Sequence, residues 1–494
     1  MILAATFLTA FAGAALVLLL PDRLARWIAL AATLAGLGCA ARAFATYDLA
    51  GAPFQNVSWF PWIPALGISF FTGADGISLA MLLLTGIIAV TGVLFSWNVT
   101  QRPRAFFAFY LVIIGGVYGV FQSLDIFLLF VFYEIVIIPK YFLIAGWGST
   151  NREYGAMKLT MYSVAGSALV LIALLATYVV SGAQTFDLFA LADPEAARFT
   201  PSFQAWAFPV MFLGFAVLAG VWPLHTWAPT GHVAAPTAVS MLLAGVVMKL
   251  GSYSALRVAM TLFPSGLDQW RLFFAVLAVA GIVLGALVAL SQKDLKYVVG
   301  YSSIAHMGFV LLGLMALNPA GLSGAVLQMF SHGIIGGLLF AVVGRIVYDR
   351  THTRDMTELG RLDLAKTLPF AAFAFTVASV ASMGLPGFSG FIAELTILIG
   401  AWTAFPALLV PAAIGAIITA TFTVRALQKS FFPPDRPREP TEQLPPVTFP
   451  ERLGTCILIG TTLVVGLFPM VLLRPILRSF ESPLMHQLFR EVSR

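Results

Sequence analysis

The chain has 494 residues, of which 60% are hydrophobic and only 10% charged, and its mean hydropathy is +0.93. Soluble proteins carry about 25% charged residues, so this composition excludes a soluble enzyme and indicates a bundle of membrane helices. The net charge of +6 is spread over short loops, which argues against nucleic-acid binding, and the two cysteines exclude a disulfide framework and an Fe–S cluster held by this chain alone.

Apolar runs between charged residues or Pro/Gly breaks predict fourteen spanning helices, because about 20 apolar residues cross the hydrocarbon core. In chain order they lie near residues 1–20, 25–45, 76–97, 106–122, 125–147, 156–181, 205–222, 235–260, 272–291, 298–317, 322–346, 368–402, 404–428 and 453–473. No basic segment precedes the first run, and Arg23 and Arg26 follow it, so we expect a retained helix rather than a cleaved signal peptide.

The loops predict the orientation of these helices. With the N-terminus outside, the cytoplasmic loops collect about twice as many Lys and Arg residues as the outer loops, so we expect both termini outside. Lys296 is counted in a cytoplasmic loop and Arg257 in an outer loop. Two connections are long: an outer loop over 46–75, and a Pro-rich cytoplasmic loop over 429–452 that we expect to be extended. Neither is large enough for a catalytic domain, so redox chemistry would belong to other subunits.

Four ionisable residues lie within predicted helices: Glu134 and Lys140 in the fifth, Lys249 in the eighth and Glu394 in the twelfth. A charge at bilayer depth costs about 3 kcal/mol even on insertion scales, so each must face protein or water. One interpretation is that these four residues form structural ion pairs or are held in their neutral forms. A chain of proton-exchanging groups is the other, and the presence of all four in one chain favours it.

Two histidines, His306 and His332, lie on the adjacent tenth and eleventh helices. A lone membrane histidine is often a packing residue, but imidazole exchanges protons readily near neutral pH, so the pair can extend the chain of groups. His225 and His232 stand near a cytoplasmic loop without a third ligand, and we therefore expect no metal site.

Proline and glycine interrupt two of the predicted helices. Pro223 ends the seventh, and Gly384-Leu385-Pro386-Gly387 interrupts the twelfth. Such breaks leave backbone amides and carbonyls without helical partners, so these groups need water or polar side chains nearby. When the breaks occupy corresponding positions in the two halves of a chain, they indicate a transport site. Spans 4–8 and 9–13 form two sets of five, and a repeated unit with an odd number of spans must be inverted.

The predicted fold is therefore an all-α polytopic membrane protein of about 14 transmembrane helices, with two inverted five-helix repeats and broken helices 7 and 12. We expect residues 1–105 to form the first three helices, 106–262 the first repeat, 271–428 the second repeat, 429–452 the cytoplasmic loop, and 453–494 helix 14 with the C-terminal tail.

Several stretches resemble the antiporter-like membrane subunits of respiratory complex I, and among them the subunit M (chain 4) family. They are, in order, ADGISLAMLLLT, FYEIVIIPKYFLIAGWGS, PLHTWAPTGHVAAPTAVSMLLAGVVMKLGSY, DLKYVVGYSSIAHMGFVLLG, QMFSHGI, HTRDM and GLPGFSGFIAEL. The resemblance implies a proton-translocating subunit of NADH:quinone oxidoreductase in the bacterial inner membrane, bound to other membrane and peripheral subunits. It implies no cofactor in this chain, with NADH, FMN, Fe–S clusters and quinone in the partners.

The same resemblance implies roles for the buried residues. Glu134 is similar to the carboxylate that modulates the central base, and Lys249 to the central lysine of the eighth span. His306 and His332 resemble the connecting relay, and Glu394 resembles the terminal acidic group of the broken twelfth span.

One departure from the family pattern concerns the seventh span. The family has a lysine where this chain has Leu218, whereas Lys140 stands where the family has an apolar residue. On an ideal helix Glu134 and Lys140 point apart, separated by about 9 Å of rise. Two hypotheses remain open: Lys140 replaces the missing base, or Lys140 binds backbone carbonyls and the subunit pumps differently or not at all.

Other functions share these central residues. They are a subunit of a multi-subunit cation/proton antiporter, a subunit of a related membrane hydrogenase or ferredoxin-dependent complex, and a structural spacer that has lost pumping. The stretches GHVAAPTAVSM, HTRDM and GLPGFSGF favour complex I.

Overall fold

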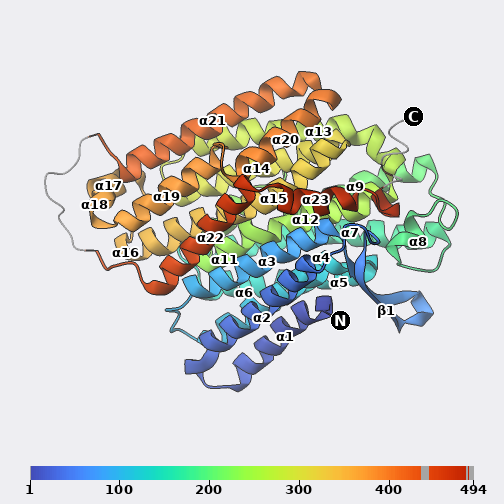
Figure 1. Ribbon diagram of the computed structural model, residues 1–494, viewed down its shortest axis with the longest axis horizontal. Helices are drawn as coiled ribbons and strands as arrows, with labels where there is room; N and C mark the ends of the chain where they lie inside the picture. The colour runs from blue at the N-terminus through green and yellow to red at the C-terminus, as the bar shows by residue number, and fades with distance from the viewer. Residues whose placement is uncertain (1, 435–443, 486–487, 489–494) are drawn as a thin grey trace.

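The computed structural model describes residues 2–434, 444–485 and 488. Figure 1 shows a bundle of roughly aligned helices, with α16–α18 at one end and β1 and α8 at the other. The uninterrupted long helices are α1 (Ile2–Leu19), α2 (Ala25–Ala45), α3 (Gly76–Phe95), α4 (Pro103–Gln122), α7 (Arg152–Ser181), α9 (Pro201–Ala219), α13 (Pro264–Ser291), α14 (Leu295–Ala316), α21 (Pro406–Phe431) and α22 (Phe449–Leu467).

The other spans are composite. They are α5 (Ile126–Ile135) with α6 (Ile137–Trp147); α11 (Thr237–Leu242), π-helical η3 (Leu243–Val247), α12 (Met248–Ser254) and π-helical η4 (Ala255–Met260); α15 (Pro319–Phe340), π-helical η5 (Ala341–Tyr348) and α16 (Asp349–Thr351); and α19 (Pro369–Ser382) with α20 (Ser389–Ala404). Thirteen spans in the described part of the chain are long and apolar enough to cross a membrane, and the pair α19–α20 supplies a fourteenth. The predicted membrane fold is confirmed.

Short elements connect these spans. They are η1 (Asp22–Leu24), β1 (Gln55–Ile63), η2 (Pro64–Leu66), β2 (Ile68–Ala74), α8 (Leu188–Ala192), α10 (Trp227–Ala234), α17 (Met356–Arg361), α18 (Leu364–Thr367) and α23 (Met470–Ser479). The strands form an antiparallel hairpin within the loop 46–75, which the sequence analysis did not predict. Part of the loop 429–452 and most of the predicted tail after Met485 lie outside the described residues.

The breaks in the seventh and twelfth spans have local causes. Gly220 ends α9 with a φ of +71°, and Gly384 and Gly387 follow α19 with φ of +70° and +97°, a region that glycine adopts without a steric penalty. Across the first break, the Trp227 indole donates a hydrogen bond of 2.7 Å to the Val217 carbonyl, which also accepts from the Gly220 amide at 3.1 Å where α9 ends. The two predicted breaks are confirmed.

A matching pair of bridges marks the two halves of the chain. Asp125 and Asp187 form an isolated antiparallel bridge and cap α5 and α8, and Asp294 and Asp355 do the same for α14 and α17. Helices α8 and α17 lie at opposite ends of the bundle (Figure 1). This arrangement supports the prediction of two inverted repeats, whose boundaries stay predictions.

A buried ion pair joins the start of α3 to η4. Arg257 donates to Asp75, and both side chains are almost completely buried. The sequence analysis counted Arg257 among the outer loop residues, which is wrong, because hydropathy does not reveal that Asp75 compensates its charge inside the helix. Asp75 also accepts a hydrogen bond of 2.9 Å from the Ser78 amide and so caps α3.

Replacing Asp75 by asparagine should destabilise the protein by about 3–5 kcal/mol, because asparagine can keep the helix cap but leaves a buried guanidinium unpaired. The thermal melting temperature of the purified protein measures this effect. The double variant Asp75→Asn with Arg257→Met removes the orphaned charge and should recover most of the loss. An unchanged melting temperature for Asp75→Asn alone would contradict a structural role for the pair.

Candidate proton path in the bundle interior

Four of the residues selected from the sequence meet inside the bundle. Lys249 comes from α12, His332 from α15, His306 from α14 and Glu394 from α20. Contacts between helices that are distant in the chain bring them together, and α15 packs against both α14 and α20. Together they form a line of titratable groups through an otherwise apolar interior.

The inner end of this line is the pair Lys249 and His332. The Lys249 ammonium lies 2.6 Å from His332 Nδ1 and also donates to the Ala244 carbonyl, and the Lys249 side chain is completely buried. Hydrogen-bonded groups at this distance can exchange a proton directly. Lys249 and His332 are therefore coupled, and the protonation of one depends on the other.

The other end of the line is the pair His306 and Glu394. His306 Nδ1 lies 3.2 Å from Glu394 Oε1, and its Nε2 lies 3.2 Å from the Ser382 hydroxyl. The Gln328 amide lies 3.2 Å from His306 Nδ1 and donates to Glu394 Oε1 at 3.4 Å. Sequence reasoning missed Ser382 and Gln328, although Gln328 lies one helical turn before His332 in the stretch QMFSHGI.

A small cavity separates the two pairs. The His306 and His332 rings have centroids 5.4 Å apart, and His332 Nε2 has no hydrogen-bond partner among the described residues. The cavity has a volume of about 10 Å³ and polar walls that include Ser302, His306, Gln328, Ser331, His332 and Ser382. This volume is close to that required by one water molecule, which would link the two imidazoles by hydrogen bonds.

Glu394 stands beside the break in the twelfth span. Its Oε2 lies so near Gly384 that a Cβ atom there would approach within 3.0 Å of it. Glu394 is also the most accessible member of the line, with 13% of its side chain exposed, compared with 6% for His306. The glycine break thus brings the carboxylate close to free backbone groups and to the surface.

Glu134 and Lys140 form a separate group in the fifth span. The span is interrupted at Val136, because Pro139 has no amide hydrogen to donate to the Ile135 carbonyl and its ring crowds that oxygen. The straight-helix separation therefore does not apply, and the two charges lie close enough to interact. Lys140 is completely buried, and neither its Nζ nor Glu134 Oε1 has a hydrogen-bond partner in the described structure.

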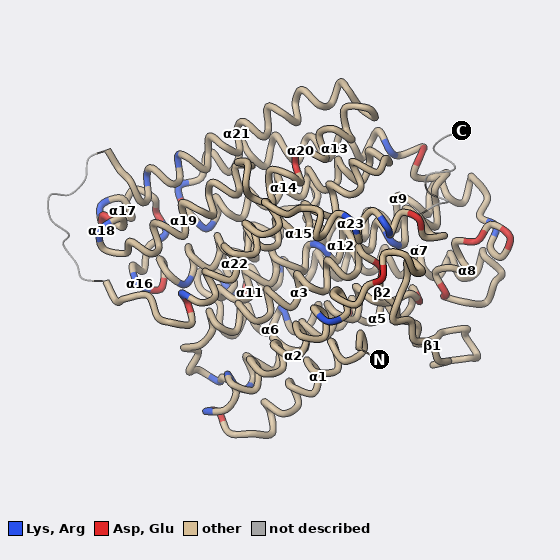
Figure 2. Tube along the Cα trace, viewed as in Figure 1, with Lys and Arg blue, Asp and Glu red and all other residues tan. Residues whose placement is uncertain are grey.

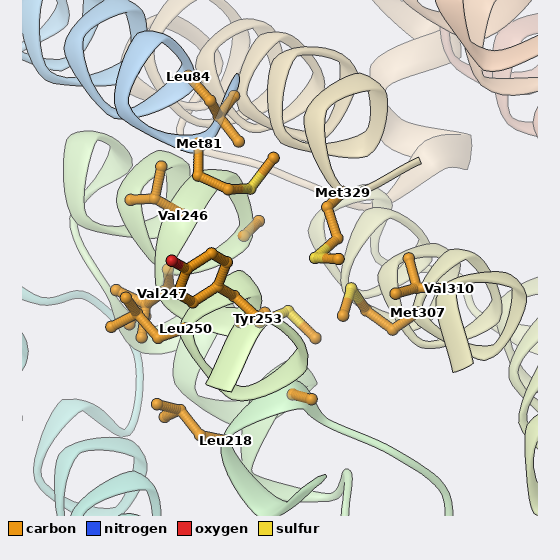
Figure 3. Close-up of a cluster of buried hydrophobic side chains, with 14 of the residues drawn as sticks. Met81, Leu84, Leu218, Val246, Val247, Leu250, Tyr253, Met307, Val310 and Met329 are labelled. Atoms are coloured by element: carbon orange, nitrogen blue, oxygen red, sulfur yellow. The ribbon is translucent and has the colours of Figure 1, made fainter. Parts of the chain in front are cut away.

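An apolar region lies where the family lysine is missing. Leu218 is buried and belongs to the same cluster of hydrophobic side chains as Val247 and Leu250, shown in Figure 3. These two residues flank Lys249 on its own helical span. Among the described residues, no hydrogen bond or ion pair links Lys249 to Glu134 or Lys140, so the two polar groups are not joined directly.

Figure 2 shows many Lys and Arg residues near the end of the bundle that carries α16–α18. Lys296, which the sequence analysis assigned to a loop at this end, is instead the second residue of α14 and only 3% exposed. Its ammonium donates to the Val233 and Ala235 carbonyls at 3.2 and 2.8 Å. Hydropathy missed this burial, because the acceptors come from a distant segment.

The chain matches the protein family described as NADH:quinone oxidoreductase/Mrp antiporter, TM, over residues 123–419. It is 38% identical over 422 residues to NAD(P)H-quinone oxidoreductase chain 4 of Gloeobacter violaceus, covering 84% of this chain and 79% of that protein. It is 35% identical over 458 residues to NADH-quinone oxidoreductase subunit M of Rhodobacter capsulatus, covering 91% and 88%. A chain of respiratory complex I from Thermus thermophilus with bound NADH superposes with a TM-score of 0.88 at 27% identity, covering 98% of this chain and 100% of that chain.

Proposed function

The chain belongs to the NADH:quinone oxidoreductase/Mrp antiporter transmembrane family, and we propose that it conducts protons without taking part in electron transfer. Its relatives include chain 4 and subunit M of quinone oxidoreductases, so it is a membrane subunit of an NADH:quinone oxidoreductase complex, and its partners are the other subunits. NADH, FMN, Fe–S clusters and quinone would bind in those partners, and this chain would respond to quinone reduction elsewhere.

The contact between Lys249 and His332 carries the proposal. A proton on the Lys249 ammonium transfers to the neighbouring imidazole nitrogen, and the opposite nitrogen of His332 releases a proton toward the cavity water. That water passes a proton to His306, which gives one to the Glu394 carboxylate. The first and last steps join groups at hydrogen-bond distance, whereas the step between the two imidazoles requires the bridging water, and Lys249 ends neutral until it is reprotonated.

The alternative of a cation/proton antiporter subunit has less support. The relatives described above carry oxidoreductase names. The line of an ammonium, two imidazoles and one carboxylate suits proton transfer but does not separate the two functions, because a cation/proton antiporter subunit also conducts protons.

The orientation follows from the same proposal. The chain is a multi-pass membrane protein, and the many Lys and Arg residues near α16–α18 support a cytoplasmic location for that end in a bacterium. The hairpin end would then face the periplasm, together with both termini. Glu394 would release protons to the periplasmic side.

Replacing Glu394 by glutamine should leave the complex assembled but lower its proton pumping by about tenfold, because glutamine fills the same space without accepting a proton. Fluorescence quenching in inverted membrane vesicles measures pumping, and NADH:ferricyanide activity reports assembly. Glu195→Gln, the same change at an exposed carboxylate, is the matched control. Wild-type pumping by an assembled Glu394→Gln complex would remove this residue from the path.

A further inference from the structure

Basic residues gather on the connections α1–α2 and α3–α4, outside the proton path described above. Residues 20–26 and 96–104 contain four arginines and one aspartate, which gives these two connections a net charge of +3. The arginines are all exposed, and they are Arg23, Arg26, Arg102 and Arg104. Arg104 is paired with Asp22 at 2.5 Å, and none of the other three has an ion-pair partner among the described residues. In Figure 2 basic residues lie at this tip of α1 and α2, toward the end of the bundle that carries α16.

Two of these arginines stack on tryptophan rings. The Arg26 guanidinium lies 5.1 Å from the centroid of the Trp97 ring, and the Arg102 guanidinium lies 4.8 Å from that of Trp147. Each also donates one hydrogen bond of 3.4 Å to a backbone carbonyl, at Trp97 and Gly146 respectively. A guanidinium has five N–H donors, and a ring beneath it holds its plane. Both groups therefore keep free donors in a fixed orientation, which suits the oxygens of a phosphate.

Tryptophans place this region at the level of the lipid headgroups. Trp27 lies in the first turn of α2, Trp97 lies two residues after α3, and Trp147 is the last residue of α6. Indole rings at the ends of spans favour the membrane–water interface. The rings also fix the α3–α4 connection, because Trp27 packs edge-on against Trp97 at 4.7 Å and the Trp147 indole donates to the Gln101 carbonyl at 2.7 Å. We call this region the Arg–Trp surface, and it consists of Arg23, Arg26, Trp27, Trp97, Arg102 and Trp147.

An apolar face of α2 continues from Trp27 toward the middle of the membrane. Trp27, Ala31, Leu34 and Gly38 follow one another at spacings of three or four residues, so they share one side of the helix, and all four are exposed. A Cβ atom at Gly38 would meet nothing within 4 Å, so this side of α2 is open. A ligand that touches both the arginines and this face needs an anionic head and an apolar chain. A phospholipid meets both requirements, whereas soluble phosphate meets only the first.

We propose that the Arg–Trp surface binds the phosphate of an anionic phospholipid, whose acyl chain lies along the open face of α2. Arg23, Arg26 and Arg102 complement the charge of the head group, and the indoles border it at the depth where the acyl chain begins. In the orientation proposed above, this lipid belongs to the cytoplasmic leaflet, where anionic lipids attract basic residues. The inference does not rest on proton transfer, because no residue of this surface belongs to the path.

The first test compares two lipids on the intact complex. It is reconstituted in phosphatidylcholine vesicles that contain a trace of either diazirine-labelled phosphatidylglycerol or phosphatidylcholine with the same label. After illumination, labelled peptides that contain Trp27 are quantified by mass spectrometry relative to peptides from α21, where Val410, Ile414 and Ile417 are also exposed. Labelling at Trp27 by phosphatidylglycerol should exceed that by phosphatidylcholine about tenfold or more, because the unpaired arginines favour the anionic head group. Equal labelling by the two lipids, or no labelling because a partner subunit covers this surface, would overturn the proposal.

Variants of the arginines test whether their charge causes the preference. Arg26→Gln should lower labelling by phosphatidylglycerol about fivefold, which corresponds to the roughly 1 kcal/mol that one basic residue contributes near an anionic membrane surface. Arg26→Lys keeps the charge but loses the flat contact with Trp97, so it should retain more of the labelling than Arg26→Gln. Arg198→Gln, the same change at an exposed arginine between α8 and α9, is the matched control and should leave labelling unchanged. Wild-type labelling in the combined Arg26→Gln, Arg102→Gln variant would also overturn the proposal.

A competition experiment separates a lipid site from a site for free phosphate. Inorganic phosphate should displace labelled phosphatidylglycerol no more than sodium chloride does at the same ionic strength, because phosphate has no acyl chain to pack on α2. Stronger displacement by phosphate would indicate a soluble-anion site and contradict the proposal. NADH:ferricyanide activity reports assembly of each variant complex. Proton pumping does not enter any of these measurements, so the lipid site and the proposed function can fail independently.

Discussion

Lys249→Ala should lower proton-coupled quinone reduction by about tenfold or more, since transfer through a positioned acid–base group contributes about 10²-fold or more to a step. The variant removes the ammonium that contacts both His332 and the Ala244 carbonyl. Electron transfer and proton pumping are coupled, so the loss should appear in two measurements. They are the rate of quinone reduction and the fluorescence quenching that reports pumping.

Two controls separate the charge of Lys249 from its packing. Lys249→Arg keeps a cation but holds its proton more firmly and has a larger head group, so it should retain only part of the activity. Lys249→Met fills a similar volume without a charge and should behave as Lys249→Ala does. Equal quinone reduction by wild type and Lys249→Ala, in complexes with the same NADH:ferricyanide activity, would contradict a central role for this lysine.

Lys140→Met should also impair pumping, by about tenfold, because it removes the buried amine that interacts electrostatically with the Glu134 carboxylate and that can carry a proton beside it. The burial of Lys140 supports this expectation. A side chain that extended to the lipid headgroups would have been exposed, whereas this one is completely buried and interacts with Glu134. We therefore propose that Lys140 supplies the base that is missing at Leu218.

The double variant Lys140→Met with Leu218→Lys tests that substitution directly. It moves the lysine to the seventh span, where the resemblance places it, and should recover much of the pumping lost in Lys140→Met. Leu218→Lys alone is the control: it puts a second cation into the apolar cluster of Figure 3 and should lower stability. Full pumping by Lys140→Met, or no recovery in the double variant, would favour the hypothesis that Lys140 has only a structural role.

The sequence determined the membrane fold and the breaks in its seventh and twelfth spans, since both depend on local properties. Fourteen apolar runs predicted the spans because each must satisfy the same hydrocarbon thickness. Gly384 and Gly387 predicted the break between α19 and α20 because few other residues adopt their backbone angles. The titratable residues were also visible, since a charge inside an apolar run stands out against its neighbours.

The tertiary structure alone decided which of those residues meet. His306 and Glu394 are 88 positions apart, and Lys249 and His332 are 83 apart, so no local pattern predicts either contact. Burial of Arg257 and Lys296 was missed for the same reason, because Asp75 and the Val233 and Ala235 carbonyls reach them from distant segments. Hydropathy and helical periodicity describe each segment by itself, whereas the packing of α12, α14, α15 and α20 places the acids and bases within hydrogen-bond distance.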